Sequence, residues 1–148
     1  MGLVGIIGSL IFVGLEMQQT QRIAIASAQE ARMNATRGNI RSMQESNLDA
    51  QSVFWERNFD YDYSPQEVGY RYSMHEQWFL MENDFYQFQA GLMDRVTWES
   101  KRGAIGRTYD RCNARDIYES RKGSFTPELR EIIESHPDEC LDDRENKI

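Results

Sequence analysis

The stretch SPQEVGYRYSMHEQWFLMENDFYQFQAG, residues 64–91, decides the fold, because it carries clear signals for one long amphipathic helix. Ser64 is a favoured N-cap, Pro65 suits the first helical position, and Glu67 completes a capping box. Gly91 is typical of the residue that follows a helix. Large apolar side chains recur between these ends at helical spacing, namely Tyr70, Met74, Trp78, Met81, Phe85 and Phe88. We therefore predict the core helix of a helical domain here.

A second apolar line on the same helix indicates that neighbours cover the helix on two sides. Its members are Tyr72, Phe79 and Tyr86, at seven-residue spacing. We expect the main stripe to pack on a helix over residues 33–48 and on Trp98. Three shorter helices are predicted downstream, at residues 94–105, 113–121 and 126–133.

Two segments in the second half of the chain are predicted to lack regular structure. Gly103 and Gly106 form a G-x-x-G, a pattern that clamps a phosphate backbone in one RNA-binding module, but nothing around it resembles that module. We interpret it as a turn at the frayed end of the helix before it. Residues 137–148 are acidic and without periodicity, so we expect a mobile or peripheral tail.

Upstream of the core helix, residues 18–49 contain one glycine and no proline, so we predict a long unbroken helix. Small residues keep to one seam of this helix, at Ala24, Ala28, Ala31, Ala35, Gly38 and Ser42. The seam packs either on the chain's own later helices or on another copy of the chain. A second stripe of Met33, Ile40 and Met43 could face a different neighbour.

The first seventeen residues, MGLVGIIGSLIFVGLEM, carry no charge until Glu16 and are apolar on every side of a helix. Such a helix spans about 25 Å, slightly short of a hydrocarbon core of about 30 Å. A cleaved signal peptide and a soluble core helix are the alternatives. However, no basic residue precedes the run, and a surface helix would show a polar face. We predict a transmembrane anchor at residues 1–17, a helical domain at 18–136 and the tail at 137–148.

Arginines set the expected orientation of the anchor. Arg22, Arg32 and Arg37 follow it and no basic residue precedes it, so we expect the N-terminus outside and the domain in the cytoplasm. Within the span, a small-xxx-small pair would let another helix approach closely. The residues predicted to carry self-association or contact with other membrane proteins are Gly5, Ser9, Ala24, Ala28, Ala31 and Ala35.

Charge and cysteine usage restrict the possible functions. The 148 residues carry a net charge of −7. This argues against nucleic acid as a partner, because such binding needs a basic face. Cys112 and Cys140 form no metal-ligand spacing with His75 or His136. We expect two free thiols in a reducing compartment.

One group of polar residues on the core helix invites a catalytic interpretation: His75, Glu76, Glu82 and Asp84. Di-iron bundles need Glu-x-x-His on two helices and zinc hydrolases need His-Glu-x-x-His, and neither pattern occurs. We therefore predict no catalytic residue, no metal and no cofactor, and interpret His75 as solvated or structurally paired. A small-molecule binding module, or an enzyme that uses His75 and Glu82, is kept as the alternative.

SLIFVGLEMQQTQ at residues 9–21 and MENDFYQFQAGLMDRVTWE at residues 81–99 resemble two signatures of a broad group of uncharacterised bacterial proteins. These proteins begin with an apolar span that leads into a Gln-rich helix, and FTPELREIIE at residues 125–134 resembles their closing helix. The resemblance implies the bacterial inner membrane as the location and carries no activity. Members usually have several more apolar residues before the point where this chain begins, so a late start would explain the short span.

Together these features predict an all-α protein in which a single N-terminal transmembrane helix continues into a long helix beside a small cytoplasmic helical bundle. The expected function is that of a membrane-anchored scaffold or accessory subunit without catalytic activity. Its expected partners are the lipid bilayer, further copies of the chain and other membrane proteins.

Overall fold

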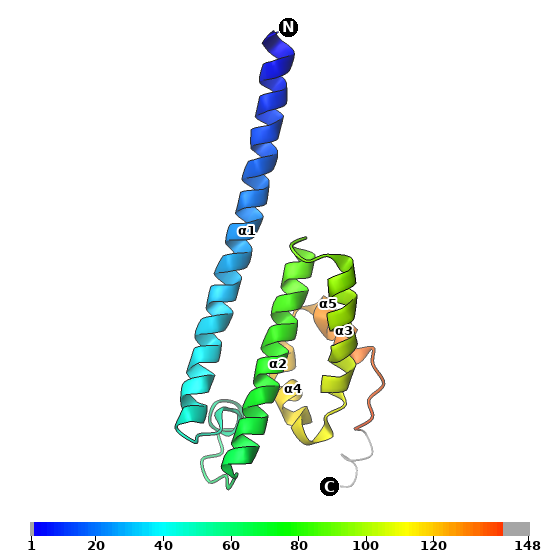
Figure 1. Cartoon of the computed structure of the whole chain (residues 1–148). Helices are drawn as coiled ribbons and strands as arrows, with labels where there is room; N and C mark the ends of the chain where they lie inside the picture. The colour runs from blue at the N-terminus through cyan, green and yellow to red at the C-terminus, as the bar shows by residue number, and fades with distance from the viewer. Residues whose placement is uncertain (1, 141–148) are drawn as a thin grey trace.

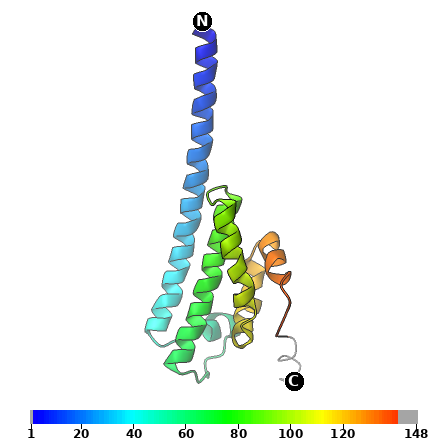
Figure 2. The same cartoon turned by 45° about the vertical axis from the view of Figure 1, so that its right-hand side comes forward.

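The structure is a computed structural model that describes residues 2–140, with side chains from residue 5 onward. Most of these residues are helical and none lies in a strand, which confirms the predicted all-α class. The α-helices are α1 (Gly2–Glu45), α2 (Pro65–Gln89), α3 (Arg95–Tyr109), α4 (Arg115–Arg121) and α5 (Pro127–Glu134). A π-helical turn, η1 (Gln51–Glu56), and two 3₁₀ turns, η2 (Cys112–Ala114) and η3 (Lys122–Ser124), lie between them. Figures 1 and 2 show α2 flanked by α1 and α3, with α4 and α5 completing a small bundle.

The boundaries of α2 confirm the signals in its sequence. The Ser64 hydroxyl accepts a hydrogen bond from the Glu67 backbone N–H at 3.3 Å, and Glu67 Oε2 accepts one from the Ser64 N–H at 2.8 Å. Gly91 has a φ of 74°, a conformation that glycine adopts without a Cβ penalty. The capping box and the terminal glycine therefore act as predicted.

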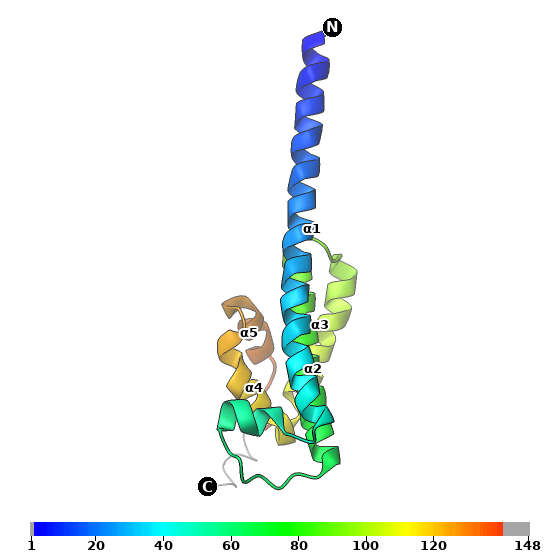
Figure 3. The ribbon, with the colours of Figure 1, turned by 90° about the vertical axis from the view of Figure 1, so that its left-hand side faces the viewer.

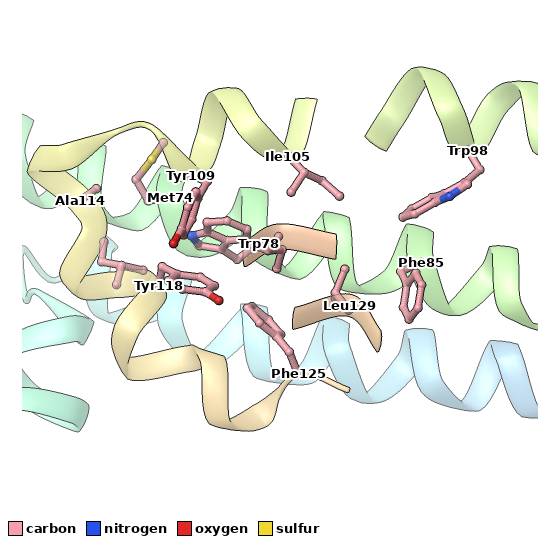
Figure 4. Close-up of a cluster of buried hydrophobic side chains, with 12 residues drawn as sticks. Met74, Trp78, Phe85, Trp98, Ile105, Tyr109, Ala114, Tyr118, Phe125 and Leu129 are labelled. Carbon is pink, nitrogen blue, oxygen red and sulfur yellow. The ribbon is translucent and has the colours of Figure 1, made fainter. Parts of the chain in front are cut away.

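The larger hydrophobic core lies between α2 and the three helices after it (Figure 4). The ring of Trp78 lies 5.3 Å from that of Tyr118 on α4 and 5.9 Å from that of Phe125. Trp98 of α3 joins the same cluster, as predicted, and stacks on Phe88 at 5.1 Å. Other buried members are Met74, Phe85, Ile105, Ile117, Leu129 and Ile133.

The expectation that this stripe of α2 packs on residues 33–48 is wrong. α1 covers the other side of α2, where Met33 and Ile40 form a smaller cluster with Phe79. The helices downstream supply enough large apolar side chains to cover the main stripe themselves, so α1 is left with the second line of α2. The prediction that α2 is covered on two sides is confirmed.

α1 is a single helix of 44 residues, unbroken as predicted. Its C-terminal half lies along α2, with Ala26, Met33 and Ile40 buried at seven-residue spacing. Its N-terminal half extends beyond the domain (Figure 3), and we call residues 2–25 the arm. No helix in the described part of the chain combines the length and the apolarity needed to cross a bilayer. The apolar run of the arm already ends at Glu16.

α3 runs further than predicted, and the two glycines lie inside it rather than in a turn. A Cβ placed on Gly106 would stand 2.8 Å from His136 Nδ1. Glycine at this position therefore allows the residues after α5 to pack directly on α3. The turn interpretation is wrong because the helix tolerates both glycines. Gly106 allows the close packing of His136, whereas Gly103 is exposed with open space around it.

Cys112 and Cys140 form a disulfide, with Cα atoms 5.2 Å apart, so the prediction of free thiols is wrong. The bond holds Cys140 against η2, where it is buried, and Arg115 donates a hydrogen bond to its Sγ at 3.2 Å. The start of the predicted tail, residues 137–140, is thus packed on the domain. The rest of the predicted tail, residues 141–148, lies outside the described residues.

Replacing both cysteines with serine should lower the free energy of unfolding by roughly 3 to 4 kcal/mol. The reason is that the bond closes a loop of 28 residues and thereby reduces the conformational entropy of the unfolded chain. Urea denaturation of the oxidised protein, the reduced protein and the Cys112→Ser/Cys140→Ser variant measures this. Reduced protein and double variant should unfold at the same urea concentration. An oxidised protein that also unfolds there would contradict the prediction.

Candidate functional site

The arm exposes an apolar surface that no described part of the domain covers. Ile6, Leu10, Ile11, Phe12 and Leu15 are each between 59% and 66% exposed. Consecutive positions point in different directions around a helix, so this surface is apolar all round rather than along one face. Exposed apolar surface of this extent marks a site of contact with lipid or protein.

The polar groups within the apolar run of the arm are satisfied inside the helix. The Ser9 hydroxyl donates a hydrogen bond to the Ile6 carbonyl oxygen at 2.9 Å. No titratable side chain occurs between Gly5 and Leu15. The run can therefore enter an apolar medium without leaving an unpaired side-chain donor.

The end of the arm meets one end of the domain. A groove there is lined by Leu15 and Arg22 of α1 and by Gly91 and Leu92 of the turn between α2 and α3. Leu92 is 40% exposed, and Val96, at the start of α3, is 81% exposed. The apolar run of the arm thus ends beside a part of the domain that also exposes apolar side chains.

The seam of small residues lies on the outer face of α1, away from α2. Ala24, Ala28, Ala31 and Ala35 are all exposed. The alternative that this seam packs on the chain's own later helices is therefore wrong. The stripe with Met33 and Ile40 packs there instead, because its larger side chains bury more apolar area. Gly5 and Ser9 are exposed on the arm.

The structure does not join His75 and Glu82 in one site. The His75 ring is 1% exposed and stacks on Trp55 with centroids 4.7 Å apart. Among the described residues, neither ring nitrogen has a hydrogen-bond partner. Burial, with the positive charges of Arg121 and Arg71, lowers the pKa of His75 to about 3, so the imidazole is neutral at pH 7. His75 is buried and neutral rather than solvated or paired.

Acid should destabilise the fold through His75. The unfolded state binds a proton at this side chain below about pH 6.5, whereas the folded state does so only near pH 3. The free energy of unfolding is therefore expected to fall as the pH decreases through this window, by roughly 2 to 3 kcal/mol at pH 4.5. His75→Leu should not show this loss in the free energy of unfolding when urea denaturation is compared at pH 7 and pH 4.5.

The matched comparison is needed because Glu82 acts in the opposite sense. Burial raises the pKa of Glu82, so lowering the pH favours the folded state at that residue. Both proteins contain Glu82, and only the wild type contains His75. Equal losses of stability in wild type and His75→Leu would contradict the prediction.

Glu82 lines a separate cavity of about 400 Å³ between α1, η1, α2 and α4. We call this the polar cavity, and its main lining residues are Arg32, Met33, Trp55, Phe79, Glu82 and Arg121. Arg121 is 4% exposed, and its guanidinium carbon lies 3.8 Å from the centroid of the Phe79 ring. Burial lowers the pKa of Arg121 to about 10, which still leaves it charged at neutral pH.

A buried ionic network fastens the segment between α1 and α2 to the domain. Arg71 Nε lies 3.1 Å from Asp49 Oδ2, its Nη2 lies 3.0 Å from Glu56 Oε1, and its Nη1 lies 2.8 Å from Asp116 Oδ2. Ser52 donates two further hydrogen bonds to Asp49 Oδ2, from N–H at 2.8 Å and from Oγ at 2.7 Å. Each of the three guanidinium nitrogens of Arg71 has a carboxylate partner. We therefore interpret this network as structural.

The described residues contain no group of three or more histidine, cysteine or acidic side chains arranged to hold a metal ion. Comparison of the chain with protein-family models, curated proteins and solved structures yields no match.

Proposed function

We propose that this chain is a membrane-anchored helical protein whose arm enters a lipid bilayer and carries the domain as a scaffold or accessory subunit of a membrane assembly. The observation that supports this most directly is the exposed apolar surface around the arm, from Ile6 to Leu15. An apolar helix without a polar face suits lipid better than it suits one protein neighbour, which would cover only one side.

The inserted segment is short. Fourteen residues, from Gly2 to Leu15, make a helix of about 21 Å, against a hydrocarbon core of about 30 Å. Local thinning of the bilayer accommodates such a deficit at a cost of fractions of a kcal/mol per Å. Association between arms relieves the same mismatch, and the exposed Gly5 and Ser9 would allow close approach there.

Self-association is the second part of the proposal. The seam of Ala24, Ala28, Ala31 and Ala35 is exposed on one face of the same continuous helix. Small side chains bury little apolar area, so a contact along this seam depends on backbone proximity and on the high effective concentration of chains in one membrane. A homo-oligomer, or packing against helices of other membrane proteins, would use this face.

Two features favour opposite orientations in the membrane. Arg22 and Arg32 follow the apolar run, which favours a cytoplasmic domain. The bond between Cys112 and Cys140 is of a kind that is usual in oxidising compartments. We retain the cytoplasmic orientation in the bacterial inner membrane, with the N-terminus outside, because flanking charges act during insertion, before the domain folds and the thiols meet.

Lipid contact is tested at single introduced cysteines carrying an environment-sensitive fluorophore, with vesicles that contain nitroxide quenchers. Ile11→Cys should be quenched from the acyl chains and Val96→Cys from the headgroups. Phe59→Cys should be quenched by neither, because residues 57–64 lie at the end of the domain remote from the arm (Figure 1). The native sulfurs are bonded and do not react.

The outcomes separate the parts of this proposal. Absence of quenching at residue 11 would overturn membrane anchoring. Quenching at residue 11 without quenching at residue 96 would leave anchoring in place and would overturn only the expectation that the start of α3 contacts the headgroups. In intact spheroplasts, labelling of Phe59→Cys by a membrane-impermeant maleimide would overturn the cytoplasmic orientation, and labelling only after lysis would support it.

A further inference from the structure

We propose that the polar cavity binds a small organic anion, with its carboxylate or phosphate group on Arg121 and Arg32 and its apolar part against Phe79 and Trp55. This goes beyond anchoring, because the cavity lies in the domain and not on the arm. Its volume of about 400 Å³ falls in the range of small-molecule sites.

The unfilled hydrogen-bonding capacity of Arg121 carries the proposal. Its side chain is 4% exposed, and within the described part of the chain its Nε has no acceptor. Nη2 lies 3.6 Å from Glu82 Oε2, which is too far for a hydrogen bond. Guanidinium groups have five donors, and buried donors are rarely left without acceptors in folded proteins. Nε is enclosed by protein, so an oxyanion in the cavity would supply acceptors to the Nη groups instead, for which no hydrogen bond is found among the described residues.

The side chain of Arg121 is also preorganised for such a ligand. Its guanidinium lies on the face of Phe79 and is 5.8 Å from the centroid of Phe125 on another side. A group fixed between aromatic rings loses little conformational freedom when a ligand binds. Its planar fork matches the two oxygens of a carboxylate or phosphate.

The charges of the cavity favour an anion over a cation. The charges of Arg121 and Glu82 oppose each other, with Nη2 and Oε2 3.6 Å apart, and burial raises the pKa of Glu82. Arg32 adds a further positive charge at the exposed rim, and it has no ion-pair partner among the described residues. The apolar wall of Met33, Trp55 and Phe79 would accommodate a hydrocarbon or aromatic portion of the ligand.

The ligand is a soluble anion rather than a lipid headgroup. The first residue of α1 that lines the cavity is Gln29, fourteen residues beyond Leu15. Along a helix this distance is about 21 Å, which places the cavity well away from the apolar run. Binding would therefore occur whether or not the arm is in a membrane.

Isothermal titration calorimetry of the full chain in detergent tests the proposal with benzoate, phenyl phosphate and uncharged benzyl alcohol. Benzoate or phenyl phosphate should bind, and the tighter of the two identifies the preferred acid group. Benzyl alcohol should not bind detectably. Arg32→Gln, at an exposed position that the fold does not need, should weaken the binding of the acid at least tenfold.

The control is Arg107→Gln, in a second basic cavity between α2 and α3 that also contains Lys101 and Arg111. This variant should bind the acid as tightly as wild type. Arg121→Lys keeps the positive charge but lacks the parallel N–H donors of the guanidinium group, so it should also weaken binding of the acid. Failure of both acids to bind wild type, or equal weakening by Arg32→Gln and Arg107→Gln, would overturn the proposal. Flotation with vesicles tests anchoring separately, so either proposal can fail alone.

Discussion

Replacing Ile7 and Ile11 with aspartate is expected to abolish membrane association of the chain. Both side chains are at least half exposed and lie one turn apart within the apolar run of the arm. One aspartate at the centre of an inserted helix costs about 2.5 to 3.5 kcal/mol. Two should therefore lower partitioning into vesicles by more than a thousandfold. Flotation of wild type and variant with phospholipid vesicles measures the change.

The control adds one negative charge outside the apolar run. Ser27→Asp places one carboxylate at an exposed position of α1, beyond the arm, and should float with vesicles like wild type. The far-ultraviolet circular dichroism of the Ile7→Asp/Ile11→Asp variant should stay helical, because no core residue contacts these positions. Undiminished flotation of the variant would show that lipid does not cover the arm.

Local signals account for the parts of the fold that the sequence predicts. Ser64 and Gly91 act within a few residues of their own positions, so the ends of α2 could be predicted without any knowledge of the tertiary structure. Helical spacing likewise identifies which side chains share a face. It does not say which neighbour that face meets, and the main stripe of α2 packs on α3, α4 and α5 rather than on α1.

The competition between two stripes on α1 shows the same limit. Small residues from Ala24 to Ser42 and large residues from Met33 to Met43 both recur at helical spacing. The large residues are favoured only because they bury more apolar area than the small ones. That area can be compared only when the surface on which they pack is known. The disulfide is beyond sequence reasoning for a similar reason, because two cysteines 28 residues apart form no local pattern.

Buried arginines are what sequence reasoning missed in the candidate site. Arg71, Arg115 and Arg121 are each no more than 6% exposed, although arginine is a residue type usually found in solvent. The composition contains a signal, since the sequence has fourteen arginines and three lysines. Arginine is preferred to lysine for buried pairs and aromatic stacking, so this excess indicates internal use. It does not identify which arginines are internal.

Replacing Arg71 with methionine should lower the free energy of unfolding by about 3 to 5 kcal/mol. The aliphatic part of the side chain is kept, but Asp49, which is 2% exposed, loses its charged partner in a buried position. Although burial opposes its charge, the carboxylates of Asp116 and Asp49 raise the pKa of Arg71, so the guanidinium is charged at every accessible pH. The loss should therefore be seen throughout the neutral range by urea denaturation.

A double-variant cycle separates the network from the packing. Asp49→Asn keeps an acceptor for Ser52 while removing the charge, so Arg71→Met combined with Asp49→Asn should cost clearly less than the sum of the two single changes. Arg41→Met is the control, because its pair with Glu45 is exposed on both sides and should be worth less than about 1 kcal/mol. Additive losses in the cycle would mean that the buried charge of Asp49 does not depend on Arg71.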